Sequence, residues 1–102
     1  RFENVPVAIV LVSRAGEHPK IPLWEQELSA GASAMLLLVA ANAMGYAASW
    51  VTGWYAYDRN VMTALGLSAH ERVAGVIGIG SADDVPERSR PELSHLVTHW
   101  AP

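Results

Sequence analysis

Two arginines near the C-terminus have the type and spacing that suit the binding of an anion. They are Arg88 and Arg90, separated by a single serine. In an extended chain, residues i and i+2 point to the same side, so both guanidinium groups could converge on one phosphate. Arginine suits this task because its planar fork can donate two hydrogen bonds at once. This motif alone favours the alternative, in which both side chains are solvated beside Glu87 and Glu92.

Two tryptophans flank a short segment that suits contact with a flat ligand. Trp50 and Trp54 stand on either side of Thr52 and Gly53, where a strand is expected to end. An indole beside a glycine-containing segment can stack on a planar ring, although packing in the core explains the pattern equally well. No side chain in the sequence has the setting of a tuned acid, base or nucleophile. Any hard chemistry is therefore expected to come from a cofactor.

Glycines in the last apolar segment and histidines in the tail do not complete a known motif. Gly78 and Gly80 lack the third glycine and the following helix of a dinucleotide fingerprint. Together with Gly75, they are more typical of a strand that another backbone or a flat ligand approaches closely.

His95 and His99 are spaced i, i+4 but have no third metal ligand nearby in sequence. We therefore expect two surface histidines and no metal site.

The composition excludes several classes of protein. The chain has 102 residues with a net charge of −3, and 51% of them are hydrophobic. A negative net charge argues against nucleic-acid binding, which needs a basic surface. The high apolar content excludes an intrinsically disordered protein. The chain has no cysteine, which excludes a disulfide scaffold and fits a reducing compartment, so a cytoplasmic protein is expected. No signal-peptide pattern is visible, and a first residue other than Met suggests a piece of a longer protein.

The middle of the chain, residues 28–57, carries no charged side chain. About 20 apolar residues can span a bilayer, but polar residues and glycines interrupt this stretch and no basic cluster flanks it. The preferred interpretation is a helix over residues 23–44, begun at Pro22 and ended by Gly45. From residue 28 onward its apolar side chains cover the whole circumference, as in a helix that is buried on all sides. A chain this short cannot supply that cover, so we expect a second subunit, a missing part of the chain, or both.

Apolar and β-branched runs predict three strands around this helix. Residues 5–13 and 72–79 have the pattern of buried strands, and residues 46–52 that of a shorter one. Asp58 is a suitable N-cap for a second helix that continues through Leu65 and that Gly66 would close. Residues 81–91 are polar and turn-rich, and a tail with a short helical or extended stretch follows. The order of strand, helix, strand, helix and strand predicts an α/β or α+β arrangement.

The sequence also resembles a known family over residues 2–79. The segment 20–31, KIPLWEQELSAG, is similar to the C-terminal half of the nitroreductase-like FMN oxidoreductases, in particular their compact NAD(P)H nitroreductase branch. Later matching positions are Met35, Ala40, Ala41, Gly45, Trp50, Gly53, Val61, Gly66, Val73, Gly75 and Gly80. The resemblance implies that residues 1–102 are the C-terminal part of a single nitroreductase-like domain.

The resemblance implies an α+β fold with a central, mainly antiparallel sheet flanked by helices. The helix over residues 23–44 would be the long dimer-interface helix of a homodimer. Two FMN sites would lie at this interface, each built from both chains. The segment from Trp50 to Thr52 would lie along the flavin, with Gly53 completing a turn, and the two arginines would hold the phosphate. The cofactor-binding residues implied are Trp50, Val51, Thr52, Gly53, Arg88 and Arg90.

The activity that the resemblance implies is an FMN-dependent oxidoreductase with a ping-pong mechanism. NAD(P)H would give a hydride to FMN, and the reduced flavin would pass electrons to a nitroaromatic, quinone or similar small-molecule acceptor. Residues 40–45 match a helix end that the family links with the nicotinamide nucleotide. The family's Arg-Arg-Ser-type segment, which grips the FMN phosphate, has no counterpart among the 102 residues. The alternative is therefore a non-catalytic flavin-binding or dimerisation module derived from such an enzyme.

Overall fold

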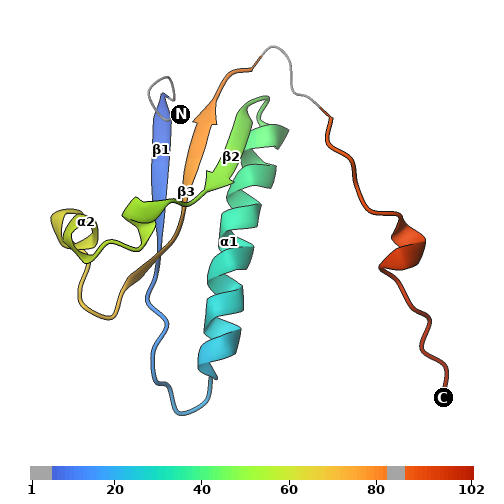
Figure 1. The fold of residues 1–102 in the computed structure, drawn as a ribbon, viewed down its shortest axis with the longest axis horizontal. Coiled ribbons are helices and arrows are strands. Elements are labelled where there is room, and N and C mark those ends of the chain that lie inside the picture. The colour runs from blue at the N-terminus through green and yellow to red at the C-terminus, as the bar shows by residue number, and fades with distance from the viewer. Residues whose placement is uncertain (1–5, 83–86) are drawn as a thin grey trace.

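Three antiparallel strands form the sheet at the centre of the computed structural model, which describes residues 6–82 and 87–102. The strands are β1 (Val7–Ser13), β2 (Ala47–Val51) and β3 (Arg72–Gly80), with β3 in the middle (Figure 1). Ile77 of β3 is paired with a residue of each neighbouring strand and is fully buried. The three strands predicted from apolar runs are confirmed, with ends that differ by one or two residues. Residue 5, where the first was expected to begin, lies outside the described chain.

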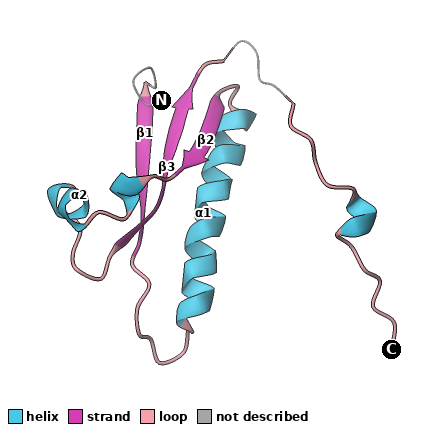
Figure 2. Cartoon of the chain, in the orientation of Figure 1, coloured by secondary structure: helices cyan, strands magenta, loops and turns pink. Residues whose placement is uncertain are grey.

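One long helix, α1 (Leu23–Ala43), lies along a face of this sheet (Figure 2). Pro22 occupies the N-cap position with φ −59°, a backbone angle that suits the start of a helix. The helix ends in a Schellman motif, because the N–H groups of Gly45 and Tyr46 donate to the carbonyls of Asn42 and Ala41 at 3.0 and 2.9 Å. Gly45 has φ +89°, a conformation that favours glycine. The predicted helix is confirmed and ends one residue earlier than expected.

The buried residues of α1 are small, and several of its large apolar residues are exposed. Ala34 and Ala41 are 0% and 5% exposed and lie seven residues apart, on one side of the helix. Alanines at these positions let the helix axis approach the strands closely. The exposed apolar side chains that we call the outward face of α1 are Leu28, Met35, Leu36 and Val39. Within this chain the helix is therefore covered on one side only.

The short helix α2 (Arg59–Ala64) begins after Asp58, as the sequence indicated, and ends one residue earlier than expected. The carboxylate of Asp58 accepts hydrogen bonds from the backbone N–H groups of Asn60 and Val61 at 2.8 and 3.1 Å. Gly66 follows the helix with φ +86°, so the left-handed conformation needed to leave the helix is filled by glycine. A 3-10 turn, η1 (Trp54–Ala56), connects β2 to this helix and was not predicted.

The C-terminal tail, residues 87–102, is exposed throughout and lies apart from the sheet (Figure 1). Its one regular element is the 3-10 turn η2 (Leu93–His95). His99 lies beyond this turn, so the two tail histidines do not share an α-helical face. No cluster of three metal-ligating side chains occurs in the part of the chain that the structure describes. Among those same residues, no helix is both long and apolar enough to cross a membrane.

Candidate functional site

Trp50 is the predicted site residue that the structure holds by specific contacts. It lies in β2 and is paired with Ile77 of the central strand. Its indole Nε1–H donates a hydrogen bond to the backbone carbonyl of Ala74 at 3.2 Å. The residue is nevertheless 39% exposed, so part of the indole faces solvent. Core packing and availability to a ligand, which the sequence left as alternatives, are thus combined in one side chain.

Two glycines make room for this indole, one on the sheet and one on the helix. A Cβ atom at Gly75 would overlap with Nε1 and Cδ1 of Trp50. Gly75 lies two residues from Ile77 in β3, so it is the diagonal neighbour of Trp50 on the same face of the sheet. On the other side, a Cβ atom at Gly31 of α1 would lie 3.7 Å from Cη2 of the indole. The indole therefore occupies a space between β3 and α1, which we call the Trp50 socket.

A cavity of about 460 Å³ opens beside the Trp50 socket. It lies between the first half of α1, the end of β2 and the start of β3. Two aromatic side chains, Trp50 and Tyr57, contribute to its wall, and Glu27 and Arg72 bring charges of opposite sign. The volume falls within the range of small-molecule sites, and aromatic walls with a few polar groups are typical of them. The cavity therefore suits a flat, partly polar ligand.

The three residues after Trp50 continue from the sheet into the connection to η1. Val51 ends β2 and is paired with Val76, whereas Thr52 is exposed. Gly53 is extended, with φ −175° and ψ −170°, so its backbone conformation does not require glycine. A Cβ atom there would lie only 2.6 Å from Cε2 of Tyr55. The close approach of the tyrosine ring favours glycine at this position, and the carbonyl of Gly53 accepts a hydrogen bond from the N–H of Ala56 at 3.0 Å at the start of the turn η1.

Arg88 and Arg90 lie in the exposed tail, away from the Trp50 socket of their own chain (Figure 1). Neither arginine forms an ion pair with another residue of the described ranges. The four consecutive residues 50–53 thus lie at the end of β2 and just after it, and the two arginines lie apart from them.

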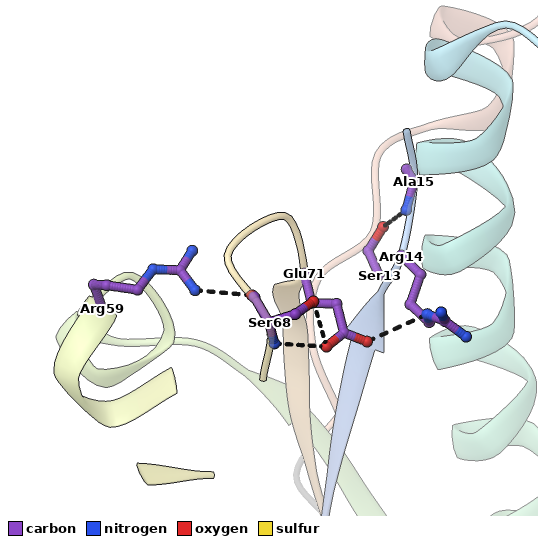
Figure 3. A network of polar contacts seen from close by, with 6 residues as sticks. All are labelled: Ser13, Arg14, Ala15, Arg59, Ser68 and Glu71. Atoms are coloured by element: carbon purple, nitrogen blue, oxygen red, sulfur yellow. Dashed lines mark hydrogen bonds and ion pairs between the residues drawn. The ribbon is translucent and has the colours of Figure 1, made fainter. Parts of the chain in front are cut away.

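A polar network fixes the loop that leads into β3 (Figure 3). One carboxylate oxygen of Glu71 accepts hydrogen bonds from the backbone N–H and the hydroxyl of Ser68, at 2.8 and 3.0 Å. The other oxygen forms an ion pair with Nε of Arg14 at 3.3 Å. The guanidinium of Arg59 donates to the carbonyls of Ser68 and Ala69, each at 3.1 Å. The network therefore ties β1, α2 and the start of β3 to one loop.

These contacts lower the pKa of Glu71 below its ordinary value. The hydrogen bonds from Ser68 are the largest cause, and the positive charge of Arg14 adds to them. Burial acts in the opposite direction but does not prevail. The neighbours of Glu71 in sequence, His70 and Arg72, both line the cavity. A charged Glu71 therefore helps to hold that part of the cavity wall in place.

The sequence pointed to Trp50 but not to most of the residues that contact its indole. Gly75 was noted for close approach by a backbone or a flat ligand, and the flat group that approaches it is the indole of Trp50. The carbonyl of Ala74 carries no sequence signal, because every residue has such an acceptor. Gly31 lies within the segment KIPLWEQELSAG, but its contact with Trp50 depends on how α1 packs.

Comparison with known proteins identifies the family. The sequence model described as the Nitroreductase family matches residues 1–81. The chain belongs to this family. The protein of Escherichia coli K12 named "Putative NAD(P)H nitroreductase YdjA" is 33% identical over 78 residues, which are 76% of this chain and 43% of that protein. A Haemophilus influenzae protein named "Putative NAD(P)H nitroreductase" is 35% identical over 69 residues. These residues are 68% of this chain and 38% of that protein.

Solved structures of nitroreductase-like proteins have the same fold as this chain. A nitroreductase-like family protein from Bacillus cereus superimposes with a TM-score of 0.81 at 22% identity, over 92% of this chain and 50% of its own. A nitroreductase with bound FMN from Bacteroides fragilis gives a TM-score of 0.66 at 19% identity, over 95% of this chain and 52% of its own. The predicted nitroreductase-like α+β fold is confirmed. The chain spans about half the length of these structures and less than half of the two relatives above.

Proposed function

We propose that residues 1–102 are the C-terminal part of a single nitroreductase-like domain in an FMN-dependent, cytoplasmic NAD(P)H oxidoreductase. Its electron acceptor would be a nitroaromatic, a quinone or a similar small molecule. The observation that carries this proposal is the family match over residues 1–81. The names of the two bacterial relatives support it, as does the FMN bound in the Bacteroides fragilis structure.

The described residues fit a flavin at the end of β2. The partly exposed indole of Trp50 offers an aromatic surface beside a cavity of about 460 Å³. Within the described residues β2 is an edge strand, so the backbone groups on its outer side, near Val51 and Thr52, are not used by the ladder with β3. Such groups can hydrogen-bond to the polar edge of the isoalloxazine. An apolar surface next to free backbone donors and acceptors is what a flavin requires.

The two arginines of the tail would neutralise the phosphate of a flavin held by a second subunit. Arg88 and Arg90 lie in the tail that is apart from the sheet of their own chain, and they carry positive charge without an ion-pair partner in the described ranges. Arginine binds phosphate strongly because charge and paired hydrogen bonds act together. In this arrangement each flavin site would contain residues from two chains.

The outward face of α1 would join the two subunits of a homodimer. Its four side chains are between 52% and 67% exposed in the single chain, and residues 28–57 carry no charge. A continuous apolar face of this kind is typical of a surface that another protein covers. A second copy fits because a two-fold axis places the same helix against itself.

The residues of this chain would act by binding and orientation. When bound, FMN accepts a hydride from NAD(P)H and supplies electrons to the acceptor. Trp50 would contact the ring system, the backbone near Thr52 would hold its polar edge, and the cavity wall would seat the substrate ring. No acid or base side chain of this chain is required, because the protein contributes position and electrostatics.

Purification of the whole protein tests this function. We expect a yellow dimer whose visible flavin absorbance is bleached by NADH or NADPH and returns on addition of a nitroaromatic or quinone. An intact mass measured on the same sample gives the length of the complete chain. A colourless protein that takes up no added FMN would exclude the proposal. A flavin-binding dimer that does not oxidise NAD(P)H would favour the non-catalytic module instead.

A further inference from the structure

The register of β3 leaves one carbonyl available to the indole of Trp50. The pairing of β1 with β3 passes from Leu11 opposite Gly75 to Val12 opposite Val73, so Ala74 has no partner in β1. The ladder with β2 ends at Val76, so Ala74 has none there either. A residue left out of the ladder by such a register shift keeps its backbone groups free for other contacts. Its carbonyl accepts the hydrogen bond from Trp50 at 3.2 Å.

Gly75, the next residue along β3, allows the indole to reach that carbonyl. Any side chain at Gly75 would occupy the space of the indole nitrogen and of Cδ1. The obstructing atom would be a Cβ, which is fixed to the backbone and cannot rotate away. The indole would then have to leave the Trp50 socket, and its hydrogen bond to Ala74 would be lost. The orientation of Trp50 thus depends on the absence of a side chain at one position of a neighbouring strand.

We propose that Gly75 is a positioning residue for the flavin, acting through Trp50. By keeping the indole in the Trp50 socket, Gly75 sets the aromatic surface that the isoalloxazine meets at the end of β2. Register shifts in strands are common beside functional sites, and the one at Ala74 leaves unpaired the residue whose carbonyl holds the indole of Trp50. This inference rests on the proposed flavin function and adds a residue that contacts no ligand itself.

The test uses the whole protein and compares Gly75→Ala with Gly16→Ala as a matched control. A Cβ at Gly16 would meet only one atom, the carbonyl oxygen of Arg14, at 4.0 Å, so the control adds the same methyl group without a clash. FMN is titrated into the apoprotein, and its dissociation constant is measured from the quenching of tryptophan emission. The visible circular dichroism of bound flavin, which responds to the orientation of a neighbouring ring, is recorded in parallel.

We expect Gly75→Ala to weaken FMN binding by roughly tenfold and to change the visible circular dichroism, because a hydrogen bond and a ring contact are lost together. Gly16→Ala should match the wild type in both measurements. The same glycine change is then made with Trp50→Val, which removes both atoms that would overlap. In that background, Gly75→Ala should change FMN affinity by less than about twofold, because the two positions are coupled.

The outcomes separate this inference from the function on which it rests. Unchanged FMN affinity and circular dichroism in Gly75→Ala would overturn the inference and leave the flavin function standing. An equal loss with and without Trp50→Val would also overturn it, because the effect would then not pass through Trp50. A wild-type protein that takes up no FMN would overturn both. If Gly75→Ala alone does not fold, the same measurements are made on Trp50→Val. An FMN affinity and a circular dichroism of Trp50→Val equal to those of the wild type would refute the role of Trp50, and with it the role of Gly75.

Discussion

Shortening one side chain on the outward face of α1 tests whether this face joins two subunits. Leu36 is 67% exposed in the single chain. Complete burial of a leucine side chain contributes about 1.5–3 kcal/mol, so covering the exposed two-thirds contributes about 1–2 kcal/mol. A two-fold interface contains Leu36 twice, so Leu36→Ala is expected to weaken the dimer by about 2–4 kcal/mol.

At about 1.4 kcal/mol per tenfold change, the dissociation constant of the dimer should rise roughly 30- to 700-fold. Sedimentation velocity of the whole protein over a dilution series measures this constant directly. Leu65→Ala is the matched control, because Leu65 is 52% exposed but lies at the end of α2, away from α1 (Figure 1). A dimer that dissociates equally in both variants, or a wild type that is monomeric, would refute the assignment of this face.

Two further predictions concern the polar contacts around α2. Asp58→Ala removes the acceptor for two backbone N–H groups and should lower the free energy of unfolding by about 1 kcal/mol. The control, Asn60→Ala, should change the free energy of unfolding less. Equal urea midpoints for the two variants would contradict the capping role of Asp58. Glu71 has a pKa lowered from 4.5, so its contribution to stability is present above that value and is lost as the pH falls through its folded pKa. Glu71→Gln should therefore flatten the acid side of the pH–stability curve, and a curve that keeps its full acid slope would exclude this role.

The elements of the fold were predictable because their signals are local. Pro22 and Gly45 mark the ends of α1, and Asp58 and Gly66 mark those of α2, through backbone angles and caps that need no distant partner. The apolar runs likewise identified all three strands. The 3-10 turn at residues 54–56 carried no such signal, because its shape follows from the path that the chain takes between β2 and α2.

The candidate site was predictable only in part, because it depends on contacts between distant residues. Trp50 drew attention as an aromatic residue near a glycine, but its hydrogen bond spans 24 positions in the sequence. The register shift at Ala74 is a property of two strands together and cannot be seen in either one. The placement of Arg88 and Arg90 follows from the course of the tail, which no local pattern specifies.

The absence of charge between residues 28 and 57 also determines how two subunits would meet. Charged surfaces steer partners toward each other over long distances and accelerate their encounter, at a rate that salt suppresses. The outward face of α1 adds no charged side chain of its own to such steering, so any field that acts between two copies would come from the rest of the chain, whose net charge is −3. At the contact itself, discrimination between a second copy and an unrelated helix would then rest on the fit of side-chain shapes.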